Sequence, residues 1–236
     1  MKTIAIMQPY FFPYIVYFQL INAVDKFVFY DDVNYIKQGW VNRNNILLQG
    51  QPFTFTIPLK NISSFSKINE IVISELPANW INKLLATFRQ AYTKAPYFPK
   101  VFPLIEDIIT TCNHKVISLI AASSIEKVLA YLSISKDIIP SSVCYTNENL
   151  KASRRVIDIC KKEAAGKYIN AIGGVELYNC VDFKEAGIDL NFLQPVITPY
   201  NQFGNKFVGG LSIIDVMMFN SVEWIREQLS LGKIVK

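Results

Sequence analysis

The chain of 236 residues is poor in histidine and in paired cysteines. Its four cysteines are widely spaced and form no C-x-x-C pair, so the spacing typical of a zinc site is missing. We expect free, buried thiols. Any Ser-His-Asp or Cys-His device would have to use the one histidine, His114. It stands at the expected start of a helix, in Cys112-Asn113-His114-Lys115, where a capping or surface role is more common.

A long apolar run is also missing, although 51% of the residues are hydrophobic and can form a substantial core. No run reaches the roughly 18 residues that a membrane span needs, and the N-terminus enters a predicted strand without a signal-peptide pattern. We therefore expect a cytoplasmic protein with no membrane span. The formal net charge of +5 is mild. Its densest basic cluster, within residues 151–167, suits the phosphate of a small molecule better than a nucleic-acid partner.

The most informative stretch is IAIMQPYFFPYIVYFQLINAVDKFVFYDD, residues 4–32. Residues 4–7 are an apolar run typical of a strand buried on both faces. A helical pattern follows, and residues 27–30 read as a second strand that ends at Asp31 and Asp32. Such crossovers make neighbouring strands parallel, and ligands bind at the carboxyl ends of parallel strands. The two loops after these strands should therefore lie side by side and form a site.

Polar and aromatic side chains concentrate at this predicted edge, which suits binding better than packing. We predict that the substrate-binding residues of the first loop and helix are Gln8, Tyr10, Pro13, Tyr14 and Tyr17. Phe11 and Phe12, in the same loop, are more typical of a core. Asp31, Asp32 and Lys37 are the candidate catalytic residues, the aspartates as proton acceptors or as magnesium ligands.

Residues 33–45 are too polar for a core and too rich in large side chains for an idle loop. Trp40 offers a flat surface, and Asn42, Arg43 and Asn44 offer directional hydrogen bonds. Such a set can hold a sugar or a base together with its phosphate. The alternative, of equal weight, is a loop pinned by its own asparagine side chains.

The rest of the chain alternates strands and helices. We predict a hairpin over residues 46–58 that turns at Gly50-Gln51, and a further short strand at 71–73. A helical insertion at 78–132 carries an apolar stripe typical of a core. Further strands are expected at 137–143, 167–172 and 188–193, and further helices at 150–164, 175–178, 213–219 and 222–231.

Two features of this second half point to ligand binding. Arg154 and Arg155 lie in the first turns of a predicted helix, where the helix N-terminus favours anions. Gly173-Gly174, followed by Tyr178, stands between a strand and a helix, where a ligand can approach the backbone closely. We add all five residues to the predicted site. Near the C-terminus, Ser212 is a predicted helix cap and Asp215 a structural residue.

These elements predict one α/β domain over residues 1–236, with a mostly parallel, Rossmann-like sheet. The chain lacks both G-x-G-x-x-G and a P-loop, which argues against an ordinary dehydrogenase or kinase.

Several stretches together resemble the WbqC-like family of bacterial polysaccharide-locus proteins. They are IAIMQPYFFPYIVYFQLI, DKFVFYDDVNYIKQGWVNRNNI, AYTKAPYFPK, KYINAIGGVELY and GGLSIIDVMMFN. One departure is Val16, at a position where glycine is expected. The resemblance implies a role in O-antigen biosynthesis and the addition of an amino acid, particularly glycine, to an amino sugar.

The opening also resembles nucleotidyltransferases and pantothenate-synthetase-like ligases, which carry His-x-Gly-His at the first helix. Here the matching stretch is Tyr14-Ile15-Val16-Tyr17, which keeps the spacing but has no imidazole. Tyrosines stay neutral near pH 7, and this puts an adenylating step in doubt.

Together the two resemblances imply amide formation between a carboxylate and the amine of a nucleotide-linked amino sugar. ATP with magnesium, or a preactivated acyl donor, would supply the activation. Arginines would hold phosphates, and catalysis would rest on proximity and electrostatics. The alternative is a non-catalytic protein that binds a nucleotide sugar or partners a glycosyltransferase.

Overall fold

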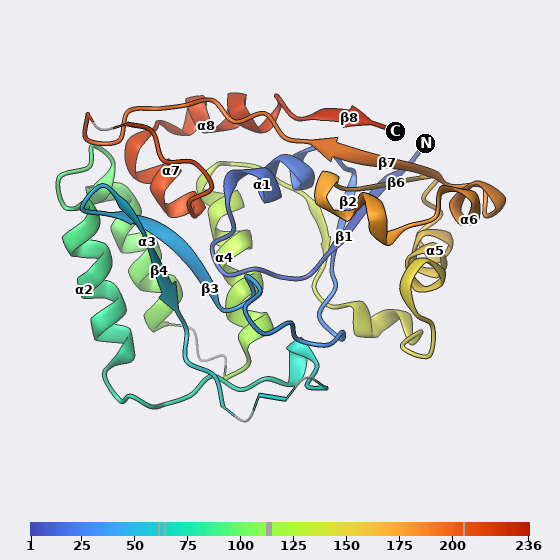
Figure 1. The fold of residues 1–236 in the computed structure, drawn as a ribbon, viewed down its shortest axis with the longest axis horizontal. Coiled ribbons are helices and arrows are strands. Elements are labelled where there is room, and N and C mark those ends of the chain that lie inside the picture. Colours follow the sequence, from blue (N-terminus) through green and yellow to red (C-terminus); the bar gives the residue numbers. More distant parts are fainter. Residues whose placement is uncertain (61, 64, 112–114, 205) are drawn as a thin grey trace.

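The computed structural model describes residues 1–60, 62–63, 65–111, 115–204 and 206–236 (Figure 1). Cys112 and His114 lie outside the described residues, and so do the predictions made for them. The described cysteines are free, as expected, but Cys144 and Cys180 are exposed and only Cys160 is buried. None of the described helices is long and apolar enough to cross a bilayer.

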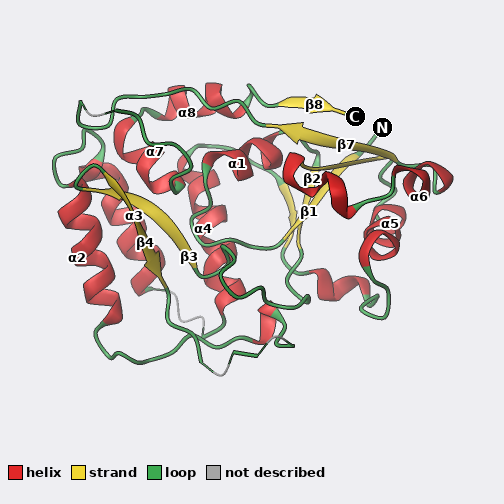
Figure 2. Cartoon of the chain, viewed as in Figure 1, coloured by secondary structure: helices red, strands yellow, loops and turns green. Residues whose placement is uncertain are grey.

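A mostly parallel sheet forms the centre of the described chain and confirms the predicted fold class (Figure 2). Its six strands have the order β5-β2-β1-β6-β7-β8, and only β8 is antiparallel to its neighbour. The strands are β1 (Thr3–Met7), β2 (Lys26–Phe29), β5 (Asp137–Ile139), β6 (Lys167–Ala171), β7 (Asp189–Gln194) and β8 (Lys233–Val235).

The strand order reverses direction between β1 and β6. From β1 the chain proceeds outward to β2 and β5, and it then returns to β6 on the other side of β1 and continues to β7. The connections at the carboxyl ends of β1 and β6 therefore diverge. In open α/β sheets this divergence leaves a crevice in which ligands bind.

Helices cover both faces of the sheet, as the apolar first strand predicts. Ala5 and Phe27 belong to a hydrophobic cluster with α1, whereas Ile4 and Val28 pack with α5 and α6 on the other face. Successive side chains of a strand point to opposite faces, so a strand buried on both sides is continuously apolar. These and the two C-terminal helices are α1 (Ile15–Asn22), α5 (Ala152–Lys162), α6 (Cys180–Glu185), α7 (Ile213–Phe219) and α8 (Val222–Leu229).

The predicted helical segment is present as α2 (Trp80–Tyr92), α3 (Phe98–Thr110) and α4 (Ile117–Tyr131). Together with the hairpin of β3 (Arg43–Leu48) and β4 (Gln51–Thr56), α2 and α3 lie at the opposite end of the molecule from α5 and α6 (Figure 1). That these helices form an insertion stays a prediction.

Four local predictions are wrong. The hairpin turns at Gln49-Gly50, both with positive φ, because a two-residue turn of this kind needs left-handed backbone at both positions. Residues 71–73 make only isolated bridges. The strand expected over 137–143 ends at Ile139, before a proline that cannot donate to the sheet, and a 3-10 helix, Ser142–Tyr145, follows.

The fourth wrong prediction concerns the C-terminus. The final helix ends at Leu229, and strand β8 follows where none was expected. Its three residues are too few to show the alternation of a strand. Earlier in the chain, the helix expected over 175–178 is a 3-10 helix, Ile172–Leu177, that begins directly after β6.

An ion-pair network joins α5's end to the amino-terminal edge of the sheet. The Glu163 carboxylate lies 3.0 Å from Nζ of Lys2 and 2.8 Å from Nζ of Lys26, and it accepts a hydrogen bond from the Tyr145 hydroxyl at 2.8 Å. Burial alone would raise the pKa of Glu163, but these hydrogen bonds outweigh it and lower the pKa to about 2.

Candidate functional site

The loop after β1 divides its aromatic side chains between the core and a cavity. Phe11 and Phe12 are fully buried in the main hydrophobic cluster, as the sequence favoured. Tyr10 and Tyr14, on either side of them, are only partly buried and line the cavity. One short loop thus serves both packing and the candidate site.

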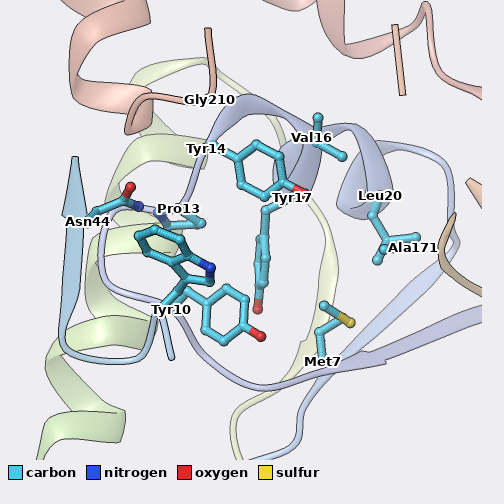
Figure 3. A pocket seen from close by; sticks show the side chains of 11 residues that line it. Met7, Tyr10, Pro13, Tyr14, Val16, Tyr17, Leu20, Asn44, Ala171 and Gly210 are labelled. Carbon is cyan, nitrogen blue, oxygen red and sulfur yellow. The ribbon is translucent and has the colours of Figure 1, made fainter. Parts of the chain in front are cut away.

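The cavity encloses about 300 Å³ and lies where the strand order reverses. Met7 ends β1 and Ala171 ends β6, so the carboxyl ends of both strands reach it. Figure 3 shows the side chains of Tyr10, Tyr14 and Tyr17 around this space. The lining residues are Met7, Tyr10, Pro13, Tyr14, Val16, Tyr17, Leu20, Trp40, Asn44, Ala171 and Gly210.

The polar groups of the cavity are mainly tyrosine hydroxyls. Tyr17 donates its hydroxyl hydrogen to the Gln8 carbonyl oxygen at 2.9 Å. In the part of the chain that the structure describes, the hydroxyls of Tyr10 and Tyr14 have no hydrogen-bond partner. Burial raises the pKa of Tyr10 and of Tyr14, so both remain neutral donors and acceptors. None of the described lining residues is charged, and the cavity therefore suits an uncharged polar ring.

The predicted loop of residues 33–45 ends at residue 42, because residues 43–45 already pair with β4 as the start of β3. Polar side chains hold the loop, and it reaches the cavity. Asn42 accepts from the Tyr35 hydroxyl at 2.7 Å and donates to the Ile57 carbonyl at 2.8 Å. Arg43 donates to two carbonyls of the loop, that of Gly39 at 3.0 Å and that of Gln38.

Trp40 forms the exposed edge of the cavity. Its side chain lines the space and remains 41% exposed, and the Arg43 guanidinium lies 5.5 Å from its ring centroid. Asn44 lines the cavity too, but its Nδ2 is used by the Phe12 carbonyl at 2.8 Å. Self-pinning thus has support in the hydrogen bonds of Asn42, Arg43 and Asn44, and ligand contact by this segment stays a prediction.

The two candidate carboxylates lie at the neighbouring strand end, outside the cavity lining. Asp31 accepts through Oδ1 from Ser141 Oγ at 2.7 Å and from the Ser142 backbone N–H at 3.1 Å. Burial raises its pKa, and in the described residues its Oδ2 makes no hydrogen bond. Asp32 is different, because it accepts from the Ser142 hydroxyl and pairs with Arg155 at 2.5 Å.

Arg155 is buried rather than free to bind a ligand from solvent. Besides the Asp32 pair, its Nε donates to Asn147 Oδ1 at 2.9 Å, and its guanidinium lies 4.9 Å from the Tyr30 ring centroid. The structure therefore brings two of the predicted residues, Asp32 and Arg155, together with each other and not with the cavity.

The remaining predicted residues are dispersed. Lys37 and Arg154 are exposed, and Arg154 lines a separate hollow at the start of α5. Gly173 and Gly174 lie in the 3-10 helix after β6, where a Cβ at Gly174 would come within 2.3 Å of the Asn170 side chain. Tyr178 shares a hydrogen bond of 3.2 Å with the Tyr168 hydroxyl.

Comparison with known proteins places this architecture in a family. The model of the WbqC-like protein family matches residues 8–227. The chain belongs to this family. It is also 28% identical over 222 residues to the uncharacterized protein Rv1507c of Mycobacterium tuberculosis (strain ATCC 25618 / H37Rv), a match that covers 93% of this chain and 94% of that protein. No solved structure matches.

Several lining residues of this WbqC-like protein are not predicted from its sequence, namely Met7, Val16, Leu20, Ala171 and Gly210. Val16 and Leu20 are one helical turn apart, with Tyr17 beside them, so the spacing on the helix carried a usable signal. Gly210 has a φ of +71°, a conformation that suits glycine, and it stands in the GGLSIIDVMMFN motif.

A second buried polar cluster anchors the segment before α7. Asp215 is fully buried and accepts from the hydroxyls of Tyr92 at 2.7 Å and Tyr200 at 2.6 Å, and from Gln202 Nε2 at 2.6 Å. Burial raises the pKa of Asp215. Ser212 caps α7, as predicted, by accepting from the Ile214 N–H at 3.2 Å.

Proposed function

We propose that this WbqC-like protein transfers an amino acid such as glycine, or another acyl group, to the amine of a nucleotide-linked amino sugar in surface-polysaccharide (O-antigen) biosynthesis. The observation that carries the proposal is the uncharged, tyrosine-lined cavity at the reversal of strand order. The sugar ring enters this cavity, because its hydroxyls can bond Tyr10 and Tyr14 and its apolar faces can contact aromatic rings.

The nucleotide remains outside the cavity, because no described lining residue is charged and a diphosphate requires cations. Lys37 belongs to the loop that carries Trp40 at the cavity's edge, and Arg43 at the start of β3 lies against the Trp40 ring; this edge is the proposed place for the phosphates. Arg154 and Arg155 are not used in this arrangement, since one lines a separate hollow and the other is paired with Asp32.

Amide formation requires the amine to attack an activated carbonyl, with loss of a proton from nitrogen and of the leaving group from carbon. Asp31 is the proposed proton acceptor, because its Oδ2 makes no hydrogen bond within the described residues and burial raises its pKa. Asp32 is committed to Arg155, so within the described structure Oδ2 of Asp31 is the one carboxylate oxygen of this pair that is left for a magnesium ion. ATP with magnesium and a preactivated donor both stay open as the source of activation.

A specific observation also supports a non-catalytic alternative. The described cavity lining contains no charged group and no nucleophile, and Asp32 and Arg155 neutralise each other. A protein with these features can hold a nucleotide sugar for a partner glycosyltransferase without chemistry of its own.

Calorimetric titration of UDP-glucosamine and its dTDP counterpart tests the binding step. We expect Trp40→Ala to weaken binding by about tenfold, equivalent to about 1.4 kcal/mol of lost ring contact. Trp80→Ala is the matched control, because Trp80 lines a different hollow. Equal affinity in all three proteins, or no binding by the wild type, would contradict the proposal that the sugar binds in this cavity.

Mass spectrometry of the amino sugar after incubation with glycine, ATP and magnesium then tests the chemistry. A new amide that disappears in Asp31→Asn, while binding persists, supports the transfer. Binding without turnover, with ATP or with a preactivated glycyl donor, favours the non-catalytic alternative.

A further inference from the structure

The backbone of a single residue, Phe12, is held by polar side chains from three distant parts of the chain. Its N–H donates to Oγ of Ser124 on α4 at 3.0 Å. Its carbonyl oxygen accepts from Nδ2 of Asn44 on β3 at 2.8 Å and from Oγ of Ser212 at 2.7 Å. All four residues are buried. The loop after β1, the hairpin, α4 and the C-terminal segment therefore meet at one residue.

Phe12 also adopts a backbone conformation that phenylalanine avoids. Its φ is +44°, in the left-handed region, and its side chain is fully buried. A bulky residue persists there only when its surroundings over-determine the conformation. The three side chains supply that constraint, and Ser124 is itself oriented by donating to the Ala121 carbonyl at 2.7 Å.

The position of this strained residue links it to the cavity. Phe12 lies midway between Tyr10 and Tyr14, whose hydroxyls are unpartnered within the described residues. The backbone direction at Phe12 determines how these two rings lie relative to each other. A loop that becomes ordered only on binding loses conformational entropy, and this loss weakens the affinity. A loop that is already ordered before the ligand arrives avoids that cost.

We infer that Ser124 and Ser212 are positioning residues of the cavity: they lock the backbone of Phe12 in its left-handed form and so hold Tyr10 and Tyr14 in place for the ligand. The inference rests on the proposed function in one respect, that this cavity is the ligand site. Neither serine lines the cavity, and both act through the loop.

Ser124→Ala removes the acceptor for the Phe12 N–H. Ser118→Ala is its control, since it removes another buried hydroxyl from the same helix that does not bond the Phe12 backbone. Hydrogen–deuterium exchange of the Phe12 amide should become faster by about tenfold or more in Ser124→Ala, the scale expected for one lost buried hydrogen bond. The affinity for UDP-glucosamine should fall by about tenfold in the same variant. Ser118→Ala should match the wild type in both measurements.

A second pair guards against a folding defect in the first. Ser212→Ala removes both the bond to Phe12 and the cap of α7. Ser221→Ala removes only a cap, that of α8, where Ser221 accepts from the Trp224 N–H at 3.2 Å. A loosened Phe12 amide in Ser212→Ala and not in Ser221→Ala would separate the lock from helix capping.

The exchange and binding measurements distinguish two kinds of failure. If the wild type binds no nucleotide sugar, the proposed function fails, while exchange at Phe12 still decides whether the lock exists. If exchange at Phe12 is unchanged in Ser124→Ala and Ser212→Ala, the lock is wrong. If exchange accelerates but the affinity of a binding-competent protein does not change, the positioning role is wrong.

Discussion

The buried ion pair between Asp32 and Arg155 allows the sharpest prediction of stability. Both side chains are 4% exposed, and the Arg155 guanidinium also bonds Asn147 and lies over the Tyr30 ring. Arg155→Met retains most of the apolar volume. It leaves the Asp32 carboxylate buried with Ser142 as its described partner.

Removal of one partner from a buried pair costs about 3–5 kcal/mol, because the remaining charge is uncompensated. We therefore expect the free energy of unfolding of Arg155→Met to fall by about 4 kcal/mol, a large share of the roughly 5–15 kcal/mol typical of a domain. Arg154→Met is the matched control. Its side chain is adjacent in sequence but exposed, and its effect should stay within about 0.5 kcal/mol.

Urea denaturation followed by circular dichroism measures these changes. The double variant Asp32→Asn with Arg155→Met should lose less than the sum of the two single variants, because it no longer leaves a buried charge alone. A loss below about 1 kcal/mol for Arg155→Met, well under the expected cost of an unpaired buried charge, would refute the reasoning. It would also revive the phosphate-binding role that the sequence suggested for Arg155.

Three further predictions concern other parts of the fold. The free energy of unfolding should fall as the pH decreases from about 4.5 to about 2, because Glu163 has a depressed pKa in the folded state. In urea titrations, the free energy of unfolding of Glu163→Gln should depend less on pH over this range. The same pH dependence in Glu163→Gln as in the wild type would contradict the assignment. Iodoacetamide at mildly alkaline pH should label the exposed Cys180 and not Cys160, because burial raises the pKa of the Cys160 thiol to about 12. Peptide mass spectra that show Cys160 modified in the folded protein would count against this prediction. Tyr92→Phe should lower the free energy of unfolding measured in urea by about 1–3 kcal/mol, because the buried Asp215 carboxylate loses a hydrogen-bond donor. Tyr131→Phe is the control and should change the free energy of unfolding little, because the Tyr131 hydroxyl has no hydrogen bond in the described residues.

The sheet could be predicted from the sequence wherever local patterns decide structure. The apolar runs of β1 and β2 and the capped pattern of α7, found at residues 213–219 as expected, are local signals. Strand β8 could not be found in this way, because its three residues become a strand only through pairing with β7. The hairpin turn was misplaced by one residue because Gly50 takes the second turn position and not the first.

The candidate site was predictable in its aromatic half and not in its charged half. Tyr10, Tyr14 and Tyr17 follow a strand end closely, so their place beside a crevice follows from the fold class. Arg155 looked like a ligand-binding cation because it stands in the first turns of a helix. Its partner Asp32 is 123 residues away in sequence, and one sequence contains no signal for such pairing.

The loop of residues 10–14 contributes side chains both to the hydrophobic core and to the candidate site. Phe11 and Phe12 anchor the loop in the hydrophobic cluster, and their neighbours Tyr10 and Tyr14 are thereby turned towards the cavity. A substitution at Phe12 would therefore damage stability and binding together and could not assign a role to either. A substitution at Ser124 acts on the conformation of the loop, and a substitution at Trp40 acts on the exposed edge of the cavity. Ser124 and Trp40 are therefore suitable positions for a test of the proposed binding that leaves the core packing of the two phenylalanines in place.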